Sequence, residues 1–191
     1  ASILLVYLLV NELYDRKTAL ISSLLYATIP TIVVGSRIVQ NENFFIPLWL
    51  LALFFVSKYL LTKKSVFLTF CAIVCGLLIL AKIPWIAAAG SIVLIFLFLK
   101  RYKDVYKFLL IVIPIGLLYA AYGLFYDPKL FLNLFGFQLN RYDIGFTSIF
   151  ALFQKPYLVD RFLTDGWIYF GWFAILLLFT DIKKHYIILF A

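Results

Sequence analysis

The sequence predicts an all-α protein, a polytopic bundle of transmembrane helices forming one domain over residues 1–191. Hydrophobic residues make up 65% of the chain, charged residues only 14%, and the mean hydropathy is +1.05. Soluble domains, in contrast, are about half apolar. The apolar residues occur in runs of about 16 to 19, close to the length that crosses a bilayer, with short polar clusters between them. This pattern is typical of a chain that crosses a membrane several times.

Six apolar runs are long enough to be full spans, and a shorter run at each end would be a partial span. The expected full spans are residues 18–34, 44–61, 66–81, 83–99, 108–126 and 166–180. The partial spans are residues 2–13 and 186–191, so we expect the chain to be part of a longer protein. A very tight turn joins the third and fourth full spans, because Pro84 restricts the residue before it to extended geometry.

The basic residues predict the orientation of the bundle. If successive spans alternate in direction, one membrane face carries 11 of the 17 Lys and Arg residues and the other carries 6. The smaller set is Arg37, Lys82, Lys129, Arg141, Lys155 and Arg161. Because cytoplasmic loops are rich in Lys and Arg, the larger set is predicted to be cytoplasmic and the smaller set outside. The net charge of +8 therefore indicates topology, not a nucleic-acid partner.

One long connection, residues 127–165, falls on the predicted outer side. It mixes many aromatic residues with Asn, Gln, Arg and Asp, which is typical of segments at the level of the lipid headgroups. A loop of this length in a compact protein is usually functional. We expect short interfacial helices over the outer face.

A polar stretch, residues 35–43, separates the first two full spans and holds Arg37 and Glu42. An ionisable residue at the edge of a membrane segment is a functional candidate, since a partner, a ligand or water must offset its desolvation. Structural roles stay open as well. Arg37 could extend to the headgroups, and Glu42 could occupy the first turn of the next helix, where the helix dipole favours an acid.

Lys82 and Arg141 could likewise anchor the chain at the interface. Together with Arg37 and Glu42, however, they fall on the same predicted side at membrane depth. A cationic pocket there would suit a lipid-linked phosphate.

No cofactor is predicted, although a divalent metal at Glu42 is left open. The two cysteines, Cys71 and Cys75, lie inside one apolar run and have neither CxxC spacing nor a His partner, so we interpret them as small buried side chains. His185 stands beside Lys183 and Lys184 and is interpreted as a solvated loop histidine.

These residues resemble a known family. The Ala- and Leu-rich run 18–30 with its late proline, followed by Ser36 and Arg37 and then Glu42 five positions on, resembles the protein O-mannosyltransferase and aminoarabinose (lipid A) transferase group of GT-C glycosyltransferases. Residues 76–84 are similar to the family's Gly-rich helix that ends in a lysine.

The resemblance implies roles for individual residues. Glu42 would be the catalytic-site acid that positions the acceptor or sugar. The donor phosphate would be bound by Arg37, Lys82 and Arg141. The sugar or acceptor would be bound by Asn41, Gln138, Tyr142 and Asp143. The family's main catalytic acid lies in an Asp-Glu pair of the first outer loop, which would precede Ala1, so the chain as given is expected to lack it.

By the same resemblance, the protein would be an inverting membrane glycosyltransferase in the plasma or inner membrane, with its active face outward. It would pass a sugar from a polyprenyl-phosphate carrier to a protein, lipid or glycan acceptor. Two alternatives are a transporter or flippase for lipid-linked sugars and a non-catalytic assembly subunit. The first would carry paired repeats with broken helices, and the second would leave the cations scattered around the perimeter.

Overall fold

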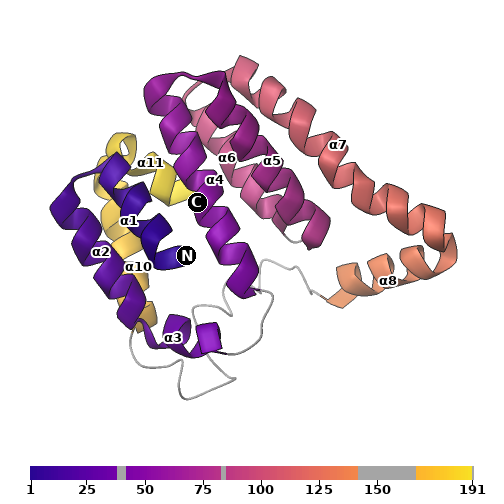
Figure 1. The fold of residues 1–191 in the computed structure, drawn as a ribbon, viewed down its shortest axis with the longest axis horizontal. Helices are drawn as coiled ribbons and strands as arrows, with labels where there is room; N and C mark the ends of the chain where they lie inside the picture. The colour runs from indigo at the N-terminus through magenta and orange to yellow at the C-terminus, as the bar shows by residue number, and fades with distance from the viewer. Residues whose placement is uncertain (38–41, 83–84, 142–166, 191) are drawn as a thin grey trace.

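In the computed structural model, which describes residues 1–37, 42–82, 85–141 and 167–190, the regular structure is entirely helical. The predicted all-α class is therefore confirmed (Figure 1). The elements are α1 (Ser2–Leu13), α2 (Arg16–Thr28), α3 (Pro30–Arg37), α4 (Glu42–Thr62), α5 (Ser65–Ala81), α6 (Ile86–Phe98), α7 (Tyr102–Tyr126), α8 (Pro128–Arg141), α10 (Trp167–Leu178), the 3-10 turn Phe179–Asp181 and α11 (Ile182–Phe190).

Two helices of the described chain are long and apolar enough to cross a membrane, Asn43–Thr62 within α4 and Tyr102–Tyr126, which is α7. The helices α1, α5 and α6 are apolar but shorter. Six full spans are therefore not shown, and that number stays a prediction.

The run expected to form one span over residues 18–34 is two helices. The first, α2, ends at Thr28, and Ile29 adopts an extended conformation with φ −62° and ψ 118°. Pro30 then begins α3. The physical reason is that the proline ring disfavours helical geometry at the preceding residue, the same rule that predicts the turn at Pro84.

The centre of the bundle is α5, which packs against α4, α6 and α7. Its buried face includes Cys71 and Cys75, which are free thiols with no exposed surface, so the interpretation as small buried side chains is confirmed. Ile92, Phe96 and Phe108 complete the same core from α6 and α7. Burial of such side chains contributes about 1.5–3 kcal/mol each when it removes them from water.

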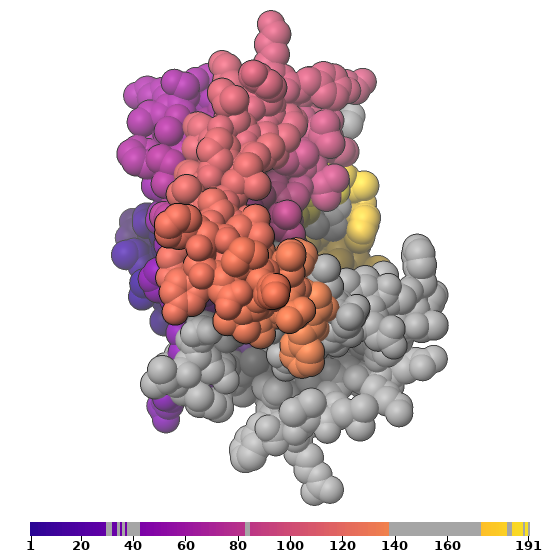
Figure 2. Space-filling model, turned by 90° about the vertical axis from the view of Figure 1, so that its right-hand side faces the viewer, coloured from indigo at the N-terminus to yellow at the C-terminus, as the bar shows by residue number. Residues whose placement is uncertain are grey.

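Two glycines let α5 and α7 approach closely. A Cβ on Gly76 would lie 2.8 Å from the Cβ of Ile115, and a Cβ on Gly116 would lie 3.2 Å from Ile79 Cγ2. Each glycine thus receives an isoleucine from the opposite helix. A third close approach, between Gly123 and the ring of Phe131, holds α8 against the end of α7. Figure 2 shows α8 lying across the lower part of the face along which α7 descends.

A buried polar cluster lies where the last turn of α4 meets the first turn of α7. Tyr59 donates a hydrogen bond of 2.7 Å from its hydroxyl to Asp104 Oδ1, and Arg101 Nε lies 2.5 Å from Asp104 Oδ2. Arg101 also donates to the Tyr59 hydroxyl at 3.2 Å and covers its ring, with 4.9 Å between the guanidinium carbon and the centroid. We call the end of the bundle that holds this cluster and the α4–α5 and α6–α7 turns the Arg101 end.

His185 is not the solvated histidine that the sequence suggested. It lies within α11, is half-buried, and stacks on Tyr14 of the α1–α2 turn with 5.6 Å between ring centroids. The Tyr14 hydroxyl and His185 Nδ1 are 2.5 Å apart. Burial raises the pKa of Tyr14, which keeps its hydroxyl protonated. The long sequence separation of the two rings explains why neighbouring residues could not indicate this contact.

Candidate functional site

The opposite end of the bundle brings together part of the predicted site. Because α4 and α5 form one antiparallel hairpin and α6 and α7 another, the start of α4, the α5–α6 turn and the end of α7 lie at the same end (Figure 1). We call this the Lys82 end.

Arg37 and Glu42 flank the break between α3 and α4. Arg37 is the exposed last residue of α3, and Glu42 is the first residue of α4, although its side chain lies outside the described part of the structure. Asn43 Nδ2 donates a hydrogen bond of 3.0 Å to the carbonyl oxygen of Gly35. This bond joins α3 to the first turn of α4.

Lys82 follows α5 and is half-buried. Its extended backbone ends the helix, and its carbonyl accepts a hydrogen bond of 3.0 Å from the Trp85 N–H. The Trp85 ring contacts the buried ring of Phe45 in α4, with 5.6 Å between centroids. This contact places the Lys82 turn beside the start of α4, and the Asn43 bond extends the connection to α3.

The remaining predicted residues stay predictions. Arg141 and Gln138 lie in the last turn of α8, but their side chains fall outside the described part of the structure. Asn41, Tyr142 and Asp143 also fall outside it. The structure therefore assembles Arg37, the backbone of Glu42 and Lys82 at one end, and it does not test the roles given to any of them.

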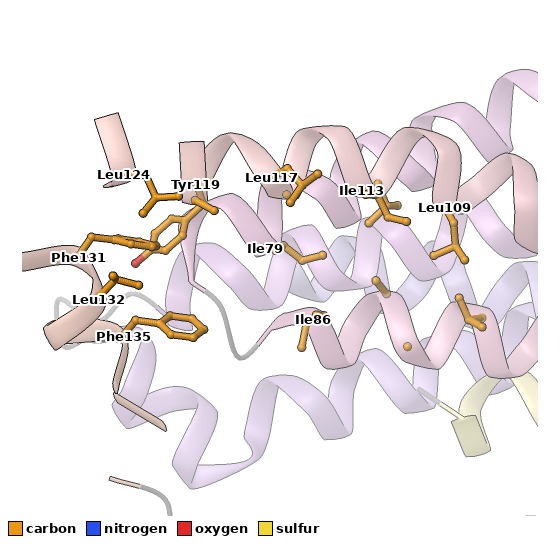
Figure 3. A pocket seen from close by; sticks show the side chains of 16 residues that line it. Ile79, Ile86, Leu109, Ile113, Leu117, Tyr119, Leu124, Phe131, Leu132 and Phe135 are labelled. Atoms are coloured by element: carbon orange, nitrogen blue, oxygen red, sulfur yellow. The ribbon is translucent and has the colours of Figure 1, made fainter. Parts of the chain in front are cut away.

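A groove of about 650 Å³, which the sequence did not indicate, runs between α6 and α7. Figure 3 shows Leu109 and Ile113 along one stretch of it, and Tyr119, Phe131 and Phe135 gathered where α8 closes one end. Apart from the hydroxyl of Tyr119, the side chains of the groove are aliphatic, phenyl or absent, as at Gly90 and Gly116. The available signal for the groove in the sequence was Gly90 and Gly116 within two apolar runs, but such glycines could equally have indicated close packing of helices.

The groove passes close to the Lys82 turn. Two of its wall residues, Ile79 and Ile86, belong to the last turn of α5 and the first turn of α6, on either side of that turn. The groove therefore reaches the two helices that the Lys82 turn connects, and its apolar walls can hold an extended apolar chain. In the described part of the structure no group of three or more His, Cys, Asp or Glu residues could hold a metal ion.

The described part of the structure is an all-helical bundle with two helices long and apolar enough to cross a membrane. Comparison with known families gives the more particular assignment: the chain belongs to the dolichyl-phosphate-mannose-protein mannosyltransferase family, whose pattern matches residues 1–124. The resemblance to GT-C glycosyltransferases is thereby confirmed. The matched segment includes Arg37, Glu42 and Lys82, whereas Arg141 lies beyond it. No curated protein and no solved structure gives a significant match.

Proposed function

We propose that this protein transfers a sugar from a polyprenyl-phosphate carrier to a protein, lipid or glycan acceptor at the outer face of the membrane. The observation that carries the proposal is membership of a glycosyltransferase family together with an apolar groove beside the Lys82 turn. The groove would hold the prenyl chain of the donor. Since its walls offer almost no polar groups, they suit a hydrocarbon far better than a sugar.

The chemistry assigns complementary roles to charges at the Lys82 end. In the transfer, the bond between the sugar C1 and the phosphate oxygen breaks, and the acceptor oxygen forms the new bond to C1. The bonding electron pair leaves with the phosphate, and the proton of the acceptor hydroxyl passes to a carboxylate. Cations aimed at the phosphate stabilise the negative charge that develops there. Removal of one such stabilising group from an enzyme typically lowers the rate by about 10²–10³-fold.

On this proposal, Arg37, Lys82 and Arg141 bind the donor phosphate and Glu42 positions the acceptor or the sugar. The place of Lys82 in the turn between α5 and α6, the two helices that contribute Ile79 and Ile86 to the groove, supports its role. Asn41, Gln138, Tyr142 and Asp143 remain the proposed contacts to sugar and acceptor.

The test is a transfer assay with the protein reconstituted in vesicles and a radiolabelled polyprenyl-phosphate sugar. We expect Lys82→Gln to lower kcat/KM by about 10²-fold. Lys129→Gln, which changes an exposed lysine in the first turn of α8, is the matched control and should have little effect.

Two results would refute the proposal. One is equal activity of Lys82→Gln and Lys129→Gln in a protein that transfers sugar. The other is movement of the intact donor across the vesicle membrane with no cleavage of the sugar–phosphate bond, which would indicate a transporter.

A further inference from the structure

A surface at the Arg101 end carries five exposed lysines. They are Lys63, Lys64, Lys100, Lys103 and Lys107, and we call them the basic surface. Lys63 and Lys64 form the α4–α5 turn, Lys100 lies in the α6–α7 turn, and the other two lie in the first turns of α7. The hydrogen bond from Tyr59 to Asp104 holds the end of α4 against the start of α7, so the two groups of lysines are neighbours.

The helices that carry the basic surface supply almost no negative charge to balance it. From residue 43 to residue 126 the sequence contains a single carboxylate, Asp104. Asp104 is buried and already bonded to Tyr59 and Arg101. On the α1 side, Glu12 is paired with Lys58 at 2.6 Å. Residues 43–126 therefore offer the basic surface no second carboxylate.

The environment of Lys63 lowers the pKa of its side chain. Partial desolvation lowers this pKa, the positive charge of Arg101 lowers it further, and Asp104 acts in the opposite direction. An anion close to Lys63 would offset the repulsion between Lys63 and Arg101.

Backbone conformation gives an independent indication. Lys63 and Lys100 both have positive φ, 59° and 56°, at positions that end α4 and α6. After α6, the Lys100 and Arg101 N–H groups bond the carbonyls of Leu97 and Phe96, which is the helix ending that normally uses glycine. A lysine in this conformation is strained, and such strain points to a role for the side chain.

The start of α7 also has aromatic anchors. Tyr102 and Tyr106 are 64% and 67% exposed and lie one turn apart, each directly preceding a lysine of the basic surface. Tyrosine rings concentrate at the headgroup level of membranes, where the ring is apolar on one side and the hydroxyl meets water. Rings and ammonium groups together match a layer of anionic headgroups beside hydrocarbon.

We propose that the basic surface binds the phosphate groups of anionic phospholipid headgroups. This site is distinct from the proposed donor site, which lies at the other end of the bundle. Charge complementarity identifies the occupant, because a leaflet rich in anionic lipid attracts each nearby Lys or Arg by an amount equivalent to about fivefold in binding.

Native mass spectrometry of the protein from micelles containing equal phosphatidylglycerol and phosphatidylcholine tests the proposal. We expect preferential retention of phosphatidylglycerol, with a several-fold loss of that preference for Lys103→Gln. Lys129→Gln at the other end should keep the wild-type preference. Equal retention of the two lipids by the wild-type protein would overturn the proposal, as would equal effects of the two substitutions.

Two further arms separate lipid binding from a purely structural role of the lysines and from binding of a different anion. The double variant Lys63→Gly/Lys100→Gly relieves the strained backbone, so it should fold at least as well as the wild type while losing lipid preference; an unchanged preference would count against the proposal. Inorganic phosphate should displace the lipid no better than chloride at equal ionic strength. Specific displacement by free phosphate, or tighter binding of an acidic peptide than of phosphatidylglycerol, would reject a lipid site.

Discussion

The two ends of the bundle use polar side chains in different ways. At the Arg101 end, Tyr59, Arg101 and Asp104 are bonded to one another, so charge fixes the position of α4 against α7. At the Lys82 end, the contacts between elements include the Asn43–Gly35 hydrogen bond and the Phe45–Trp85 ring pair, neither of which uses a charge. Substitution of a charge in the Tyr59–Arg101–Asp104 cluster should therefore lower stability, whereas substitution of the exposed Arg37 at the second end should change it little.

The largest effect on stability is expected for Asp104→Ala. This change leaves the guanidinium of Arg101 largely buried without its carboxylate, and breaking a buried pair in this way costs about 3–5 kcal/mol. Thermal unfolding in detergent micelles measures the loss. Arg37→Gln, at an exposed position of the other end, should change the free energy of unfolding by less than about 0.5 kcal/mol. Similar losses of unfolding free energy in Asp104→Ala and Arg37→Gln would show that charges contribute equally to stability at the two ends.

A smaller loss is expected where α5 crosses α7 between the two ends. Gly76→Ala would place a methyl group 2.8 Å from the Cβ and Cγ2 of Ile115, which cannot swing aside as the tip of a long side chain can. Overpacking of this kind costs about 1–3 kcal/mol. Gly136→Ala is the control, because its added Cβ meets nothing within 4 Å.

The double variant Gly76→Ala/Ile115→Ala shows whether the clash is the cause. Truncation of Ile115 should cost less in the Gly76→Ala background than in the wild-type protein, as measured by a double-mutant cycle of unfolding free energies. Strict additivity of the two changes would mean that the helices do not meet at these residues.

Stability is expected to increase when Lys63 or Lys100, the residues with positive φ at the ends of α4 and α6, is replaced by glycine. Glycine adopts positive φ without the steric cost that a side chain carries, so Lys63→Gly and Lys100→Gly should each stabilise the protein by about 0.5–1 kcal/mol. Thermal unfolding in neutral detergent, where lipid charge plays no part, is the appropriate measurement. A loss of stability would show that the lysine side chains are needed for the fold itself.

The smallest effect is expected for the acid that caps α2. Hydrogen bonds from the Thr18 hydroxyl and N–H lower the pKa of Asp15. Because the folded-state pKa is depressed, the stabilisation is complete above the unfolded value of about 3.9 and is lost as the pH falls through the folded value. Asp15→Asn keeps a capping side chain that does not titrate. The difference in free energy of unfolding between this variant and the wild-type protein should therefore change with pH only in acid. A pH-independent difference would contradict the assignment.

The sequence predicted the helical class and the family because both depend on local patterns, namely long apolar runs and the spacing of Ser36, Arg37 and Glu42. Pro30 could also have indicated the break between α2 and α3 by the rule already applied to Pro84. In contrast, the Tyr59–Asp104 bond and the α6–α7 groove join residues far apart in the chain, and hydropathy does not specify which faces of apolar helices meet. The roles of Arg37, Glu42, Lys82 and Arg141 rest on the resemblance and remain predictions.

On the proposed function, the groove beside the Lys82 turn holds the prenyl chain of the donor. Gly90 lines the groove and an added Cβ there meets nothing within 4 Å, so Gly90→Leu should fill the groove without disturbing the fold. Ala87→Leu adds a leucine side chain at an exposed position of the same helix outside the groove.

The most direct measurement is the KM for a long-chain polyprenyl-phosphate sugar in these two variants. We expect Gly90→Leu to raise KM about tenfold or more, because it displaces several buried methylene groups at about 0.8 kcal/mol each. Ala87→Leu should leave KM unchanged. The same KM in both variants would contradict binding of the carrier in this groove.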